Sequence, residues 1–247
     1  MGPENLYGVA LIALPVLLSL TLHEYGHARV ALAFGDDTAL RQGRVTLNPL
    51  AHLDLLGTLC FLIGPFGWAK PVPVDASRLH PYRIGDIAVS LAGVGMNLLL
   101  IVFGTAALYV MSRLGVQADP EQVTRSGIGA LMLAYLVLVN TSLLAFNLIP
   151  LYPLDGHHVL RDLLPHNKQA GFMEWQGRYG RWLLLGMMVV PWLGRRVFPQ
   201  LAGASPAYNP VYWFLTVAYL VLRTLMPQSA ARLADDALRT YGHLMPW

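Results

Sequence analysis

The chain has 247 residues, of which 55% are hydrophobic and only 13% charged, and its formal net charge is +3. A soluble domain carries about 25% charged residues. This composition therefore excludes a disordered chain, a nucleic-acid binder built on basic patches and most soluble folds. The single cysteine, Cys60, excludes an internal disulfide. We expect one membrane-embedded domain over residues 1–247, with the lipid bilayer as its surroundings.

Five apolar stretches meet or approach the length of about 20 residues that a membrane-spanning helix needs. They are residues 6–22, 87–112, 126–154, 182–194 and 210–226. The first stretch runs on to residue 34 and lacks a basic segment and a small-residue cleavage site, so it is not a signal peptide. The stretches predict an all-α, multi-pass membrane protein with about five transmembrane helices.

The loop between the first two predicted helices, residues 34–83, is long for a connector and largely apolar. We expect it to be partly re-entrant, with short extended pieces at 45–47 and 71–74, because open backbone is not tolerated facing lipid. Five spans would place 13 of the 17 Lys and Arg residues on one side of the membrane and 4 on the other. The positive-inside rule makes the first side cytoplasmic and puts the N-terminus outside.

The segment His23-Glu24-Tyr25-Gly26-His27 is an H-E-x-x-H motif within the first predicted helix. Residues four apart share a helix face, so both imidazoles can reach one metal ion. Glu24 lies about 100° round the helix, where it can act as a base. Chance explains the motif poorly, because each ionisable group costs about 2 to 3 kcal/mol to insert in a bilayer. The motif predicts zinc bound by His23 and His27.

A catalytic zinc needs a third protein ligand and one open position. The scarcity of acids within apolar stretches points to Asp155, which follows two prolines that end a helix and precedes Gly156, which permits a sharp turn. Asp155 could instead cap the next helix. Asn147 could hydrogen-bond the substrate carbonyl or the oxyanion, or satisfy carbonyls that Pro150 leaves free.

Several motifs recur in a fixed order: HEYGH at 23–27, NPLAHLD at 48–54, GWAKPV at 67–72, AG and Asn97 at 92–97, and Asn147 followed by LDG at 154–156. Together they resemble the site-2 protease family of intramembrane zinc metalloproteases. The resemblance covers about residues 8–165, which would form the protease core, with further helices in 166–247. In one departure, Val94 follows Gly93 where the family usually has proline.

The resemblance implies one zinc ion per chain, held by His23, His27 and Asp155. It also implies that Glu24 activates the water and that Asn147 lies near the substrate carbonyl. The family cuts transmembrane segments of other proteins close to the cytoplasmic face, which agrees with the charge asymmetry. Two alternatives remain open: a zinc-binding membrane scaffold without hydrolytic activity, and a metal transporter, for which we find no supporting repeat.

Smaller signals allow two interpretations each. His52 and Asp54 could orient a ligand or gate water, or could be interfacial polar residues without a chemical role. The segment Lys70–Val74 could clamp an unwound substrate by strand addition, or could be a turn-rich connector. The adjacent residues His157 and His158 point apart on a helix and do not suggest a second metal. Gly93, Gly95 and Asn97 are most simply read as helix-packing residues.

Overall fold

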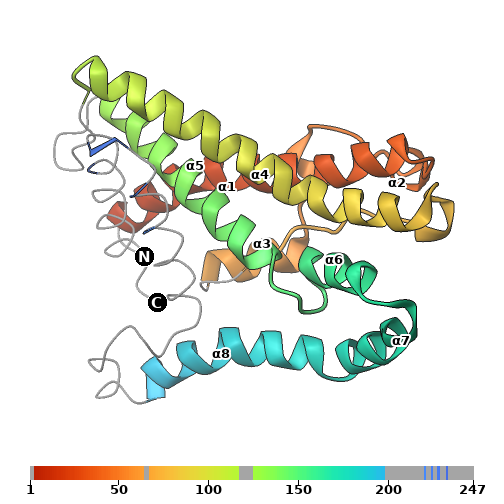
Figure 1. The fold of residues 1–247 in the computed structure, drawn as a ribbon. Coiled ribbons are helices and arrows are strands. Elements are labelled where there is room, and N and C mark those ends of the chain that lie inside the picture. Colours follow the sequence, from red (N-terminus) through yellow and green to blue (C-terminus); the bar gives the residue numbers. More distant parts are fainter. Residues whose placement is uncertain are drawn as a thin grey trace.

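The computed structural model describes residues 3–63, 67–116 and 125–197, together with isolated positions between 220 and 232. Within these ranges three long helices form the centre of the molecule: α1 (Pro3–Ala33), α4 (Tyr82–Arg113) and α5 (Arg125–Asn147). Each of the three packs against the other two (Figure 1). This three-helix bundle is the scaffold on which the remaining elements are mounted.

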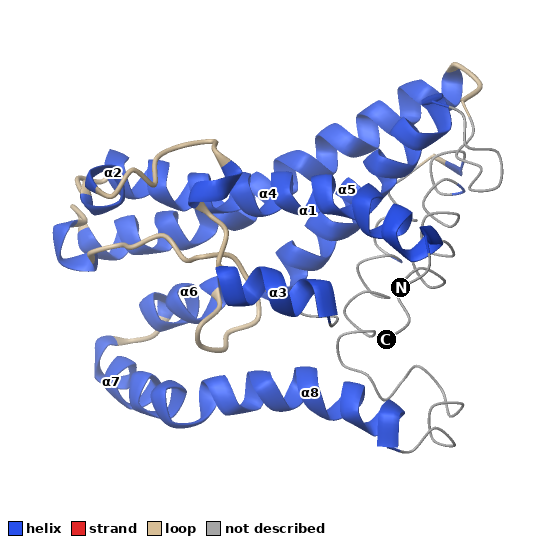
Figure 2. Cartoon of the chain, turned by 180° about the vertical axis from the view of Figure 1, so that it is seen from behind, coloured by secondary structure: helices blue, strands red, loops and turns tan. Residues whose placement is uncertain are grey.

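Shorter elements surround the bundle. They are α2 (Thr38–Arg41), α3 (Leu55–Ile63), α6 (Asp155–Leu163), α7 (His166–Trp175), α8 (Arg181–Val197), the 3₁₀ turns η1 (Pro49–Ala51) and η2 (Ala76–Arg78), and the π-helical turn η3 (Gln176–Gly180). Figure 2 shows helices and loops without a strand in the part of the chain that is described. The expectation of a mostly helical protein is confirmed.

The long helices match three of the predicted stretches. Helix α1 covers residues 6–22 and their extension, and it ends just before Gly35, whose φ of 101° is left-handed. Helix α4 begins five residues before the predicted span and continues unbroken through Gly93 and Val94. Helix α5 ends at Asn147, three residues before Pro150. Among the described residues, two helices, Tyr82–Arg113 and Ile128–Asn147, are long and apolar enough to cross a membrane.

The structure does not show whether the other two predicted stretches form membrane-spanning helices. Residues 182–194 lie within α8. Residues 210–226 fall almost wholly outside the described part of the chain. The total of five spans therefore stays a prediction.

The loop between α1 and α4 is built mainly from short helices and turns. In its described part an isolated antiparallel bridge pairs Leu53 with Ala69. Neither residues 45–47 nor residues 71–74 form a β-strand. The extended pieces expected there therefore do not pair with other strands. Whether the loop re-enters a membrane stays a prediction.

Small residues let α1 and α4 approach closely where the HEYGH motif lies. A Cβ placed on Gly26 would be 2.7 Å from Met96 Cγ and 3.0 Å from the carbonyl oxygen of Ala92. A larger residue would force the Met96 side chain and the α4 backbone to shift, so glycine favours this close contact. The close approach brings the His23 and His27 rings against the middle of α4.

Candidate metal centre

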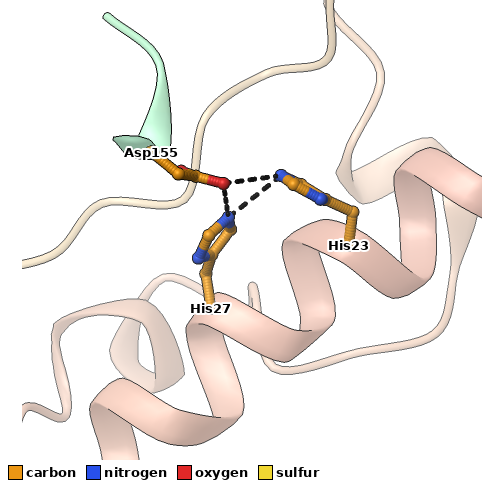
Figure 3. Close-up of side chains that lie close together, drawn as sticks. All are labelled: His23, His27 and Asp155. Carbon is orange, nitrogen blue, oxygen red and sulfur yellow. Dashed lines mark hydrogen bonds and ion pairs between the residues drawn. The ribbon is translucent and has the colours of Figure 1, made fainter. Parts of the chain in front are cut away.

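His23 and His27 lie one turn apart on α1 and direct their Nε2 atoms at the same point. The two Nε2 atoms are 3.0 Å apart, and each is 3.5 Å from Oδ2 of Asp155. Figure 3 shows the triangle that these three atoms form, with Asp155 entering from a different part of the chain. In the part of the chain that is described, these residues form the one group of His, Cys, Asp or Glu side chains that could hold a metal ion.

Helix α4 supports both rings from behind. The backbone carbonyl of Val89 lies 2.7 Å from Nδ1 of His27, and the side-chain amide of Asn97 lies 3.1 Å from Nδ1 of His23. Between them Gly93 leaves open the space that the rings occupy, because a Cβ there would lie 2.5 Å from Cε1 of His23 and would collide with His27 Nε2. Val89, Gly93 and Asn97 are four residues apart and therefore form one stripe of α4.

Asp155 reaches the histidines because the chain turns sharply after α5. Leu154 occupies the cap position of α6, and Asp155 lies in the first turn. Oδ2 of its carboxylate is turned toward the histidines and has no hydrogen-bond partner in the helix end. Gly156 makes the turn possible, since a Cβ there would lie 2.6 Å from the carbonyl oxygen of Ile149.

Charged side chains dock α6 against α4. Arg161 of α6 hydrogen-bonds Asp86 of α4 and also its neighbour Asp162, and Arg83 donates to the backbone carbonyl of Asp162. His158 lies 3.3 Å from the same Asp86 carboxylate. Asp86 and Asp162 are both nearly fully buried, so their pairing is needed to offset desolvation. This ion cluster fixes the helix that begins with Asp155.

Glu24 is buried and is held by the loop between α1 and α4. Its Oε2 accepts a hydrogen bond of 3.0 Å from the backbone N–H of Val72. The buried guanidinium of Arg44 in turn donates to the carbonyls of Lys70 and Pro71, at 2.6 and 3.0 Å. Arg44 therefore fixes the stretch of backbone that binds the carboxylate.

His52 fastens the same loop. Its Nε2 lies 2.8 Å from the carbonyl of Thr46, and its own carbonyl accepts from the N–H of Lys70. Burial lowers the pKa of His52 below its ordinary value, and the nearby Arg44 charge acts in the same direction. Because a carbonyl can only accept, Nε2 of His52 carries the proton that it donates to Thr46. Asp54 caps α3 by accepting from the N–H of Gly57.

The segment Lys70–Val74 has little free hydrogen-bonding capacity. The N–H groups of Lys70 and Val72 are taken by His52 and Glu24. Pro71 and Pro73 have no N–H to give. Strand addition by a substrate needs a row of free donors and acceptors. These contacts favour the reading of this segment as a connector that supports Glu24.

Asn147 makes a side-chain hydrogen bond within its own helix. It is half-buried at the C-terminal end of α5, and its amide nitrogen donates to the carbonyl of Leu143 at 3.0 Å. The carbonyl that Pro150 would leave free, that of Phe146, accepts from the N–H of Ile149. Asn147 is thus not needed to satisfy that carbonyl.

The histidines after Asp155 serve packing. Nδ1 of His157 lies 2.8 Å from the carbonyl of Leu154, and His158 faces Asp86. The expectation that the two side chains point apart is wrong, because their ring centroids lie 4.0 Å from each other. Neither ring belongs to the group of side chains in the described residues that could hold a metal ion.

The three converging side chains suit zinc. Two imidazole nitrogens and one carboxylate oxygen form a donor set that catalytic zinc sites use. Oδ2 of Asp155 is buried and has no hydrogen-bond partner in the described part of the chain. A buried carboxylate oxygen without a partner is costly, and a cation between the three atoms would remove that cost.

Comparison with known proteins identifies the family. The sequence model of "Peptidase family M50" matches residues 107–185. "Putative zinc metalloprotease YwhC" of Bacillus subtilis is 37% identical over 190 residues, which are 77% of this chain and 85% of the relative. "Putative zinc metalloprotease Rip2" of Mycolicibacterium smegmatis is 31% identical over 80% of this chain and 70% of its own length. "Zinc metalloprotease MJ0392" of Methanocaldococcus jannaschii is 25% identical over 67% of this chain and 37% of its own length.

The chain belongs to peptidase family M50, the site-2 protease family. It is therefore a zinc metalloprotease, and the family places it in a membrane. No solved structure gives a match to this chain.

Proposed function

We propose that this chain cuts a peptide bond within or near a transmembrane segment of another membrane protein, with His23, His27 and Asp155 as the zinc ligands and Glu24 as the general base. The observation that supports this most strongly is the convergence of the three ligand atoms inside a bundle of long apolar helices. A zinc ion held there supplies a Lewis acid that activates water and polarises a carbonyl.

The position of the site along α4 supports an intramembrane reaction. Residues 87–112 of this helix are uncharged, and Gly93, which faces the histidines, lies roughly 10 Å beyond Asp86. Further along α4, Leu98, Leu99, Val102 and Phe103 are all more than half exposed. An exposed apolar surface of this kind suits contact with lipid chains. The peptide bond would therefore be cut below the membrane surface, near the end of α4 that carries the charged residues.

Glu24 is placed to move the proton. One carboxylate oxygen is held by the N–H of Val72, which fixes the side chain and leaves the other oxygen to accept a proton from the attacking water. The same carboxylate then returns the proton to the leaving amine nitrogen. Burial beneath the loop limits access of bulk water to this step.

Asn147 is proposed to bind the substrate carbonyl. The amide would have to exchange its bond to the Leu143 carbonyl for one to the substrate, which costs little because one hydrogen bond replaces another. In the tetrahedral intermediate the oxygen carries more charge, so the same donor then binds it more strongly.

The charge distribution supports a topology. We propose five spans, with the N-terminus outside and the active site toward the cytoplasmic face, and one membrane-embedded protease domain with its core at about 8–165. Arg41, Arg44, Lys70 and Arg78 lie in the α1–α4 loop on the proposed cytoplasmic side. Labelling of single cysteines introduced on each side would check this arrangement.

The test begins with zinc content, because it needs no substrate. Detergent-purified wild type should contain about one zinc per chain, and His27→Ala and Asp155→Ala should lose it. Glu24→Gln is the matched control, because it removes the base without removing a ligand and should keep the metal. Zinc retained in Asp155→Ala would contradict the proposed third ligand.

Cleavage is measured next, in proteoliposomes that hold single-span membrane proteins with an end label. Wild type should release a shortened fragment whose new end maps within or beside the span, and Glu24→Gln should be slower by about 100-fold to 10,000-fold. Equal cleavage by both would exclude Glu24 as the base. Zinc binding without cleavage of any span would favour a scaffold, and zinc accumulation in sealed vesicles would favour a transporter.

A further inference from the structure

The hydrogen-bond partner of His27 determines which of its ring nitrogens carries the proton. Nδ1 lies 2.7 Å from the carbonyl oxygen of Val89, and a carbonyl can only accept. Nδ1 is therefore protonated, and Nε2 presents a lone pair. Since Nε2 is the atom that faces His23 and Asp155, His27 is already in the tautomer that a metal requires.

His23 needs the same tautomer, but its neighbour is ambiguous. Nε2 faces the site here too, while Nδ1 lies 3.1 Å from the side-chain nitrogen of Asn97. Asn97 is fully buried, and its other polar atom, Oδ1, has no partner in the described part of the chain. If the amide nitrogen donated to Nδ1, the ring proton would lie on Nε2 and would point at the metal position.

Turning the Asn97 amide over resolves this conflict. The nitrogen and oxygen ends of an amide have nearly the same shape, so hydrogen bonding decides which end faces a neighbour. With Oδ1 toward His23, the oxygen accepts from Nδ1–H, and Nε2 keeps its lone pair.

We propose that Asn97 is a positioning residue that accepts a hydrogen bond from His23 Nδ1–H through Oδ1 and so holds His23 ready to bind zinc through Nε2. This inference rests on the proposed zinc site. It assigns a function to each member of the α4 stripe: Val89 orients one histidine, Gly93 makes room for both, and Asn97 orients the other.

The test compares zinc affinities of detergent-purified protein by competition with a chromophoric chelator. Asn97→Leu should weaken zinc binding by about 10-fold to 100-fold, the usual effect of losing the partner of a ligand histidine. Asn97→Asp should bind zinc at least as tightly as wild type, because a carboxyl group offers an acceptor of the same size. An isosteric rescue of this kind would not follow if Asn97 acted on His23 by donating through its nitrogen, because a carboxylate cannot donate.

Asn140 provides the matched control. It is also a fully buried amide of the bundle, but it donates to Ser19 and to the Leu136 carbonyl. Asn140→Leu should lower stability and leave the zinc affinity unchanged. Wild-type affinity in Asn97→Leu, or equal losses in Asn97→Leu and Asn97→Asp, would overturn the inference.

Two further measurements separate the possible failures. If wild type binds no zinc, or if His27→Ala keeps it, the proposed metal site fails and not the function of Asn97 alone. If Asn97→Leu does not fold, ¹⁵N spectra of histidine-labelled wild type remain available. Both imidazoles whose signals change on zinc addition should carry a proton on Nδ1, and a zinc-responsive ring without that proton would overturn the inference.

Discussion

The three central helices bury different chemistry at their two ends. Toward the end that holds the C-terminal half of α4, the helices bury a hydrophobic cluster: Ile12, Leu108, Ala130, Leu131, Ala134, Tyr135, Val137 and Leu138. At the other end the same helices bury His23, Glu24, His27, Asp86 and Asn97. Tight packing supplies the stability of the first end. At the second end, burial of polar groups lowers the stability unless each group has a hydrogen-bond or ion-pair partner.

This division indicates how the bundle can carry a reactive site within an apolar surrounding. The polar end is covered by the α1–α4 loop and by α6. These two elements supply partners for buried polar side chains that have none within the three helices. Val72 binds Glu24, and Asp155 meets the histidines. If the two ends are independent, a substitution at one should leave the property of the other unchanged. Four predictions test that independence.

The largest effect is expected for Gly93→Ala at the polar end. The added methyl group would collide with both imidazole rings, so zinc affinity should fall by about 1,000-fold or more, or roughly 4 kcal/mol. Chelator competition measures it. Gly95→Ala, two residues along α4, meets nothing within 4 Å and should bind zinc normally. Normal binding by Gly93→Ala would show that the rings can move without loss.

The next largest effect is expected for Arg161→Met, which leaves the carboxylate of Asp86 buried beside α6. The free energy of unfolding should fall by about 3 kcal/mol, because removal of one partner exposes the full desolvation cost of the other. Zinc affinity should fall with it, since α6 carries Asp155. Unfolding by SDS titration in mixed micelles measures the stability.

The exposed pair Arg178–Glu174 provides the control for this prediction. Arg178→Ala should cost less than about 1 kcal/mol, as is usual for surface ion pairs. A similar loss of unfolding free energy in Arg161→Met and Arg178→Ala would mean that the ion cluster around Asp86 stabilises the fold no more than a surface ion pair does.

Leu108→Ala tests the apolar end. Leu108 is fully buried between the long helices, and the substitution should lower the free energy of unfolding by about 2 kcal/mol through loss of packing. Zinc affinity should not change, which chelator competition on the same preparation can verify. Leu99→Ala removes an exposed leucine of the same helix. It should change neither the free energy of unfolding nor the zinc affinity.

Sequence reasoning reaches furthest where the chemistry depends on side chains alone. The spacing of His23 and His27 fixes their shared helix face, and the rarity of acids in apolar stretches singles out Asp155. The partners of these residues could not be found in that way. The bond between Val72 and Glu24 uses a backbone N–H, which every residue except proline possesses, and Asn97 lies 74 residues from His23. From the sequence, Asn97 is therefore interpreted as an ordinary helix-packing residue.

The same limit applies to the loop between α1 and α4. Its apolar composition and prolines predicted chain packed against the helices, but the extended pieces expected at 45–47 and 71–74 do not pair into strands in the described residues. Arg44 organises the loop by donating to two backbone carbonyls. The sequence alone does not predict that Arg44 is buried and binds backbone carbonyls, because most arginines lie on the surface.

The smallest effect is expected for Arg44→Gln. The carbonyls of Lys70 and Pro71 would lose a charged donor, so the backbone at Val72 would hold Glu24 less firmly. Cleavage should slow by about 10-fold, because misplacement of a base by a fraction of an ångström lowers the rate without removing the base. Zinc affinity should stay at the wild-type value, since Arg44 touches no ligand, and Arg44→Lys should recover part of the rate through one of the two hydrogen bonds. A matching loss of zinc affinity would show that the loop and the metal ligands form one cooperative unit, and that the polar end is less divisible than its hydrogen bonds indicate.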